Sequence, residues 1–117
     1  MKVIVAGGRD YIATSADLKR LKETLISAGC DEVVSGAALG ADRVGELMAE
    51  YLKIPCVKFP ADWDLLGKAA GHARNKQMAQ YADAVFLFHG GKGTASMRQL
   101  AQDFGLKFLF DQDNQEG

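Results

Sequence analysis

The chain has 117 residues, a length typical of a single domain with one hydrophobic core. Apolar residues make up 48% and charged residues 25%, which excludes a collagen-like, a disordered or a heavily disulfide-stapled protein. Fourteen Lys and Arg against 15 Asp and Glu give a net charge of -1, so no overall field draws the protein toward nucleic acid or an anionic membrane. Any anion site must therefore be local.

Two features of the sequence indicate a cytoplasmic location. Cys30 and Cys56 are too few for a disulfide framework, and we expect both thiols to be reduced. The opening residues MKVIVAGG show no signal-peptide cleavage pattern, and no apolar stretch is long enough to cross a membrane. We therefore expect a cytoplasmic protein without a membrane partner.

The first half of the chain alternates short apolar runs with helical patterns. Residues 3–6 and 32–35 are short runs that predict two buried strands. Between them, apolar residues at helical spacing predict a helix capped by Thr14 or Ser15. Residues 44–52 predict an amphipathic helix. The residues on its predicted core face are Val44, Leu47, Met48, Tyr51 and Leu52.

The second half continues the same alternation. In chain order it predicts a strand over 54–59, a loop with or without one helical turn over 61–71, a helix over 72–81, the most hydrophobic strand over 84–88, a helix beginning at Thr94, and a strand over 107–110. Residues 111–117 are polar enough to form a loose tail, so the domain is expected to span residues 1–110.

Alternating strands and helices predict an α/β fold of three layers, with about five parallel strands and helices on both faces. Crossovers between parallel strands are right-handed, so the loops that follow the strands gather along one edge of the sheet. Ligands of open α/β sheets bind at that edge, where the strand order reverses.

Glycines follow three of the predicted strands. Glycine is common in the βα turns of any α/β protein, so one such loop alone indicates little, whereas three loops at one edge favour a binding site. These glycines are Gly7 and Gly8 after the first strand, Gly36 and Gly40 after the second, and Gly90, Gly91 and Gly93 after the fourth.

Residues 90–94 give the strongest of these signals. They join a buried strand to a helix start, where unpaired N–H groups and the helix dipole attract anions. Thr94 can cap that helix and donate its hydroxyl to a phosphate oxygen. The loop is not a Walker A motif because Lys92 is followed by Gly93, and residues 7–10 do not match G-x-G-x-x-G. P-loop ATP hydrolysis and ordinary NAD dehydrogenase activity are therefore disfavoured.

Five motifs occur in order over nearly the whole chain: GGRDY at 7–11, SGAALGAD at 35–42, FPADWD at 59–64 with GKAAG at 67–71, Arg74-Asn75, and GGKGT at 90–94. Together they resemble the YspA or cpYpsA-related family of the SLOG superfamily, relatives of the "lonely guy" phosphoribohydrolases. The resemblance implies a Rossmann-like fold that binds a nucleotide or a nucleotide-derived phosphate ligand, as a sensor or carrier.

The motifs and the glycine loops together define the expected ligand-binding residues. They are Gly7, Gly8, Arg9, Asp10, Tyr11, Ser35, Gly36, Gly40, Asp42, Asp62, Trp63, Arg74, Asn75, Gly90, Gly91, Gly93 and Thr94.

The sequence departs from the phosphoribohydrolases at two positions. Those enzymes carry an Arg on the helix before the fourth strand, a position that Arg74 matches, and a PGGxGT loop followed three residues later by a Glu. Here His89 replaces the proline and Met97 replaces the Glu. Losing that carboxylate disfavours cleavage of a base from ribose, so we expect binding without turnover and assign no catalytic residue.

The alternative is an N-glycosidic hydrolase that acts on nucleoside monophosphates or ADP-ribose-like compounds. In that case another carboxylate takes the place of the missing Glu. The candidates are Asp10, Asp42 and Asp62.

Some of the expected site residues also have structural interpretations. Arg9 and Arg74 can contact a phosphate, or form surface ion pairs with Asp10 or Asp64. Asp42 can accept a hydrogen bond from a ribose hydroxyl, or favour the dipole of the helix that it begins.

Trp63 can stack on a base, although a tryptophan in the core or at a dimer interface is at least as common. His72 and His89 lack partners at metal-ligand spacing, so we expect neither a metal nor a cofactor. The expected partner is a nucleotide-derived small molecule. We also expect a homodimer, because so short a chain leaves apolar helix surface to cover, and we do not expect nucleic acid to bind.

Overall fold

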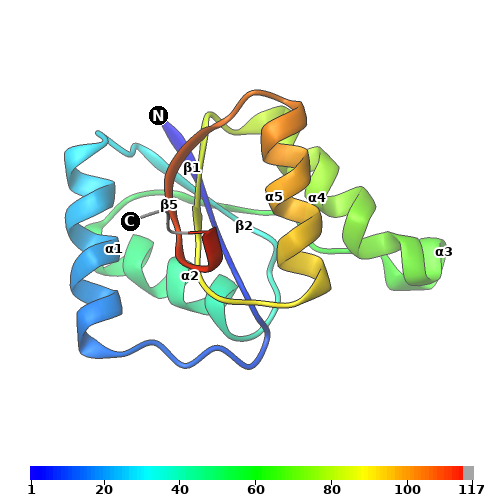
Figure 1. Cartoon of the computed structure of the whole chain (residues 1–117), viewed down its shortest axis with the longest axis horizontal. Coiled ribbons are helices and arrows are strands. Elements are labelled where there is room, and N and C mark those ends of the chain that lie inside the picture. Colours follow the sequence, from blue (N-terminus) through cyan, green and yellow to red (C-terminus); the bar gives the residue numbers. More distant parts are fainter. Residues whose placement is uncertain (115–117) are drawn as a thin grey trace.

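The computed structural model describes residues 1–114, which form one parallel sheet of five strands with helices on both faces (Figure 1). The strand order is β3-β2-β1-β4-β5. The strands are β1 (Lys2–Ala6), β2 (Glu32–Ser35), β3 (Cys56–Lys58), β4 (Ala84–Leu87) and β5 (Lys107–Asp111). The predicted three-layer α/β fold is confirmed.

The helices connect successive strands, as parallel pairing requires. They are α1 (Ser15–Ser27), α2 (Ala41–Leu52), α3 (Trp63–Leu66), α4 (Ala70–Tyr81) and α5 (Lys92–Asp103), with 3-10 turns η1 (Gly67–Ala69) and η2 (Gln112–Asn114). Thr14 caps α1 in a capping box with Asp17, one of the two predicted caps. No helix within residues 1–114 is long and apolar enough to span a membrane.

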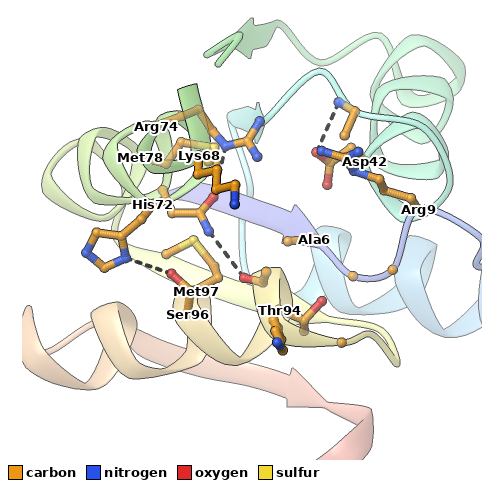
Figure 2. Close-up of a pocket in the computed structure, with 18 of the residues that line it drawn as sticks. Ala6, Arg9, Asp42, Lys68, His72, Arg74, Met78, Thr94, Ser96 and Met97 are labelled. Atoms are coloured by element: carbon orange, nitrogen blue, oxygen red, sulfur yellow. Dashed lines mark hydrogen bonds between the residues drawn. The ribbon is translucent and has the colours of Figure 1, made fainter. Parts of the chain in front are cut away.

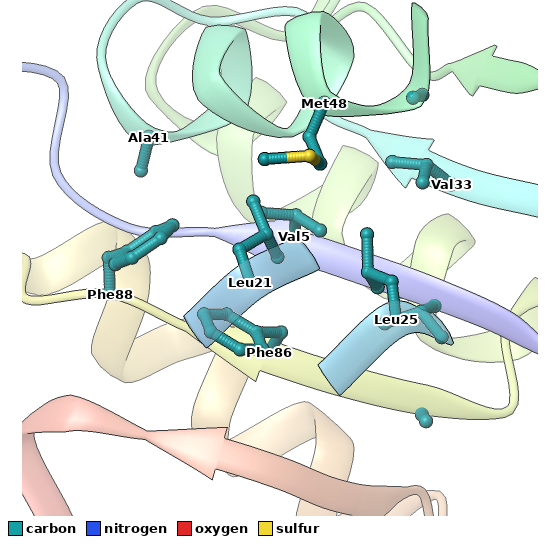
Figure 3. Packing of buried hydrophobic residues seen from close by; sticks show 11 residues of the cluster. Val5, Leu21, Leu25, Val33, Ala41, Met48, Phe86 and Phe88 are labelled. Atoms are coloured by element: carbon teal, nitrogen blue, oxygen red, sulfur yellow. The ribbon is translucent and has the colours of Figure 1, made fainter. Parts of the chain in front are cut away.

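Helices α1 and α2 cover one face of the sheet. Figure 3 shows Leu21 and Leu25 of α1 and Met48 of α2 packed around Val5 and Phe86 of the central strands. Because α1 and α2 cover this face and α4 and α5 cover the other, every residue of β4 is buried. This burial explains why the strand reads as an uninterrupted apolar run.

Helices α4 and α5 cover the opposite face. Met78 of α4, with Met97 and Leu100 of α5, packs in one cluster with Ile4 and Val85. The two cores, one on each face of the sheet, fix the positions of α2, α4 and α5 relative to the ends of the strands.

The predicted core face of α2 includes residues that are exposed in the structure. Met48 is buried, but Leu47 and Tyr51 are 47% and 68% exposed. The helix lies very close to β1, because a Cβ atom at Gly45 would lie only 2.7 Å from the Cβ of Val5. That close approach buries a narrow stripe of α2 and leaves the flanking apolar residues at the surface.

The predicted loose tail is wrong for residues 111–114. Strand β5 extends to Asp111, whose carboxylate accepts two hydrogen bonds from Arg98 at 2.6 and 2.7 Å, and η2 follows directly. Arg98 therefore joins α5 to the end of β5. Residues 115–117 of the predicted tail lie outside the described residues.

The topology determines where a site can form. The chain starts at β1 in the centre of the sheet, adds β2 and β3 on one side, and then returns to place β4 and β5 on the other. The strand order therefore reverses between β1 and β4. The loops that leave the carboxyl ends of these strands diverge and open a crevice between them.

Candidate functional site

A pocket of about 510 Å³ lies at this reversal point. The loops that follow β1, β2 and β4 form part of it, and residues from Trp63 to Met78, on α3, η1 and α4, form another wall (Figure 2). Ten of the predicted site residues line it. They are Gly7, Gly8, Arg9, Asp42, Trp63, Arg74, Asn75, Gly91, Gly93 and Thr94.

The start of α5 presents unpaired donors to the pocket. Gly91 is the N-cap residue and makes no side-chain capping bond, and the first helical hydrogen bond runs from the Ala95 amide to the Gly91 carbonyl at 3.0 Å. The amides of Lys92, Gly93 and Thr94 therefore have no partner inside the helix. A helix of twelve residues adds its dipole to these donors.

Thr94 does not cap the helix, because α5 begins two residues earlier than predicted and places Thr94 in its first turn. The residue is only 3% exposed, and its hydroxyl oxygen is the one buried side-chain polar atom in residues 1–114 without a hydrogen-bond partner. Leaving a buried hydroxyl unpaired costs about 1–3 kcal/mol. Thr94 therefore holds an unused hydrogen-bonding group beside the pocket.

Asn75 connects the two helices that flank the pocket. Its buried side chain donates from Nδ2 to the Gly93 carbonyl at 3.2 Å and accepts from Nε of Arg74 at 2.9 Å. Asn75 thereby fixes the start of α5 relative to Arg74 on α4.

Asp42 and Arg74 lie beside each other across Gly36. An added Cβ at Gly36 would lie 2.7 Å from Nη1 of Arg74 and 2.8 Å from Oδ2 of Asp42. Arg74 donates from Nη1 to the Gly36 carbonyl, and Asp42 accepts from the Ala38 amide at 3.2 Å. Gly36 does not itself line the pocket, but its missing side chain makes room for both charged groups.

Burial sets the protonation tendencies of this pair. Asp42 is 6% exposed, and burial raises the pKa of its carboxyl above the usual range even though Arg74 and Arg9 favour the charged form. Burial likewise lowers the pKa of Arg74, against the opposing effect of Asp42. Asp42 is thus a carboxyl group with a raised proton affinity at the wall of a pocket.

Arg9 and Trp63 form the outer rim. The Arg9 guanidinium carbon lies 5.4 Å from the centroid of the Trp63 ring, within cation–π range. Trp63 is 48% exposed, so it is not a core residue. Within residues 1–114 neither Arg9 nor Arg74 forms an ion pair, with Asp10, Asp64 or any other carboxylate.

The remaining predicted residues do not line the pocket, and three of them have structural contacts instead. Tyr11 stacks on Phe88 at 4.8 Å and donates to Asp17 at 2.6 Å. Ser35 is fully buried and donates to Glu46 at 2.7 Å, and Asp62 caps α3. Asp10 is exposed in the loop after β1.

Gly40 and Gly90 allow the loops to approach each other closely. Gly40 has φ of +70°, and a side chain there would collide with the carbonyl oxygens of Gly8 and Arg9. A side chain at Gly90 would overlap the Thr94 hydroxyl. Both glycines shape the pocket without lining it.

Several lining residues were not among those expected to bind ligand. Lys68 and Gly71 belong to the GKAAG motif and Lys92 to GGKGT, so the sequence contained a signal for them. His72 and Ser96 do not belong to a motif, and their side chains meet across α4 and α5 at 3.0 Å. The others are Ala6, Ala38, Met78 and Met97.

The described part of the chain contains no group of three or more His, Cys, Asp or Glu side chains that could hold a metal ion. Cys30 and Cys56 are free thiols. Burial raises the pKa of both, which favours the protonated thiol over the thiolate that binds metals.

Comparison with known proteins places this chain in a family. The model of the YspA, cpYpsA-related SLOG family matches residues 1–65. The chain belongs to this SLOG family. The matched residues of this SLOG protein run from β1 into α3 and include Arg9, Asp42 and Trp63 of the pocket.

A solved structure shares the fold of this SLOG protein over most of its length. The X-ray structure of TM1055, a target of the Northeast Structural Genomics Consortium, superposes with a TM-score of 0.71. The alignment covers 92% of this chain and 71% of that chain at 20% sequence identity, which shows a common fold. A search of curated proteins found no match.

Proposed function

We propose that this protein binds a nucleotide or a nucleotide-derived phosphate ligand in the pocket, as a sensor or carrier. The observation that carries the proposal is the buried, unpartnered hydroxyl of Thr94 beside the free amides of the α5 start. Buried polar groups in proteins are almost always paired, and a phosphate oxygen at a helix N-terminus would accept from both sets of donors.

The other walls of the pocket suit a nucleoside better than a bare anion. Met78 and Met97 form an apolar wall, and the half-exposed Trp63 ring at the rim offers a surface on which a base can stack. The Asp42 carboxyl accepts only the Ala38 amide within residues 1–114, so it can also bind a ribose hydroxyl. Apolar walls with a few fixed polar groups are typical of small-molecule sites.

Replacing Thr94 by Val tests the proposal, because it removes the hydroxyl and keeps the shape of the side chain. We expect Thr94→Val to bind nucleoside phosphates more weakly by about 1.5–3 kcal/mol, the range for a hydrogen bond to a charged group. The free energy of unfolding without ligand should not fall, since the lost hydroxyl has no partner within residues 1–114. Calorimetry with a panel of nucleotides, and urea unfolding, measure the two effects.

Thr24→Val is a matched control, because Thr24 lies on α1 and does not line the pocket. This variant should bind as tightly as the unmodified protein. Equal affinity of Thr94→Val and Thr24→Val for every nucleotide that binds would contradict the site assignment.

The position of Asp42 supports a second candidate function, that of an N-glycosidic hydrolase. Of the three carboxylates that could replace the missing Glu, only Asp42 lines the pocket, and burial raises the pKa of its carboxyl toward the range useful for proton transfer. The assay is base release from nucleoside monophosphates and from ADP-ribose. Turnover that Asp42→Asn abolishes would establish the hydrolase, and absence of release from a substrate that binds would support the sensor or carrier.

A further inference from the structure

The pocket concentrates positive charge in a protein whose net charge is -1. Four cationic side chains line it, and Asp42 is the one carboxylate among the lining residues. The cationic residues are Arg9, Lys68, Arg74 and Lys92. A cleft with this imbalance attracts an anion of more than one charge.

The described part of the protein offsets this positive charge only in part, through Asp42 beside Arg74. None of the four takes part in an ion pair in the part of the chain that the structure describes. Burial lowers the pKa of Arg74, and the neighbouring charge of Arg9 lowers it further, so the two guanidinium groups repel each other. Arg74 donates to protein acceptors from Nη1 and Nε, whereas none of residues 1–114 accepts from its Nη2 or from Nζ of Lys68.

The donors lie on two sides of the pocket. Figure 2 shows Thr94 on the α5 side and shows Lys68 and Arg74 on the α4 side. A single phosphoryl group bound at the start of α5 would satisfy Thr94 and Lys92 and would leave the cations of the α4 side without a partner. The Asp42 carboxyl lies on the Nη1 side of Arg74 across Gly36, which further restricts where a second anionic group can lie.

We propose that the pocket binds a diphosphate, with one phosphoryl group at the start of α5 and the second held by Lys68 and Arg74. The ligand class is a nucleoside diphosphate, either free or joined through its pyrophosphate to another group. This inference rests on the proposed function and names the ligand class for the same pocket. Asp42 then accepts from a hydroxyl of the ligand, because a phosphoryl group beside it would be repelled.

Inorganic phosphate and pyrophosphate test the inference without knowledge of the base. We expect the pocket to bind pyrophosphate at least roughly tenfold more tightly than phosphate, since one additional charge-assisted contact is worth about a factor of ten or more. The same ratio is expected between nucleoside diphosphates and monophosphates of the base that binds best. ADP and ADP-ribose, compared with AMP, distinguish a free from a substituted diphosphate.

Lys68→Ala should reduce the affinity for pyrophosphate roughly tenfold and leave the affinity for phosphate nearly unchanged. Lys76→Ala is the matched control, because Lys76 lies on α4, is exposed and does not line the pocket. Because Lys68 is exposed, we expect both variants to fold. Circular dichroism checks this.

The outcomes separate this inference from the proposed function. If phosphate and nucleoside monophosphates bind as tightly as the diphosphates, or if Lys68→Ala weakens both classes equally, the diphosphate site is wrong and the single-phosphate function stands. If neither class binds, the proposed function fails as well. Selective loss of diphosphate affinity in Lys68→Ala, with Lys76→Ala unaffected, supports the inference.

Discussion

At the scale of single residues, the buried Asp42 carboxyl should make stability depend on pH. Burial raises its folded-state pKa above the ordinary value of 3.8, so the native protein binds more protons than the unfolded chain between the two pKa values. Stability from this group is therefore fully present below the unfolded pKa and is lost as the pH rises through the folded pKa. The burial of Asp42 therefore costs stability at neutral pH.

Asp42→Asn tests this sign. The amide stays neutral, so the free energy of unfolding of the variant minus that of the unmodified protein should increase as the pH rises from below 3.8 through the raised pKa. Urea unfolding of both proteins across this range measures the difference. A difference that stays constant or decreases with pH would show that Arg74 and Arg9 outweigh the burial of Asp42.

At the scale of elements, η2 holds the loop that leads into α5. The Asp113 carboxylate accepts from the Gly90 amide at 3.2 Å and pairs with His89 at 2.6 Å, while Gln112 accepts from the His89 amide at 3.0 Å. Partial desolvation raises the pKa of Asp113, but the hydrogen bond with His89 and the other contacts outweigh it, so the pKa is lowered overall. The loop is thus held in place by contacts within the protein.

Asp113→Ala should loosen this loop. We expect faster amide hydrogen exchange at Gly90 and an affinity for phosphate ligands that falls by up to roughly tenfold, because fixing the backbone of one residue costs about 1–2 kcal/mol, which binding must then supply. Asp103→Ala at the end of α5 is the control, since Asp103 contacts Gln99 and not the loop. Unchanged exchange at Gly90 would show that η2 does not order it.

The contribution of η2 could not be predicted, for a physical reason. Residues 111–114 read as a polar tail because their partners His89 and Arg98 are distant in sequence, and nothing local indicates the pairing. The start of α5 was predicted two residues too late for a related reason. Gly91 serves as N-cap without a side-chain bond, whereas the sequence favours Thr94 because threonine is a common capping residue.

At the scale of the whole molecule, the strands and their parallel direction could be predicted from the apolar runs and the helices between them. Strands β1 and β4 are covered on both faces, and their patterns were correspondingly clear. The strand order brings the glycine loops to one edge, so much of the pocket could be predicted. The contact of His72 with Ser96 depends on how α4 packs against α5, which no local pattern specifies.

The homodimer stays a prediction for the whole molecule. Leu47 and Tyr51 are exposed one turn apart on α2, and a second copy that covers them would remove apolar surface from water. We expect a dimer in sedimentation velocity and a shift toward monomer in Tyr51→Lys. A monomer at all concentrations would contradict this expectation.

Substitutions of Arg98 and Arg74 should change different quantities: the free energy of unfolding for Arg98 and the affinity for nucleotides for Arg74. Arg98 joins α5 to β5 through two hydrogen bonds to Asp111, and the two side chains are 20% and 6% exposed. Arg98→Ala leaves the Asp111 carboxylate buried without its partner, so we expect a loss of about 3 kcal/mol in the free energy of unfolding, the lower end of the range for breaking a buried pair.

Arg74→Ala should show the opposite balance, because Arg74 lines the pocket and its Nη2 has no protein acceptor within the residues described. Nucleotide affinity should fall by about 1.5–3 kcal/mol, more than for Arg98→Ala measured under conditions where that variant is folded. Arg74→Lys keeps the charge but not the paired donors, so an intermediate affinity is expected. Calorimetry and urea unfolding of the three variants provide both quantities. If Arg98→Ala costs more binding energy than Arg74→Ala, the charged side of the site lies on α5 and not on α4.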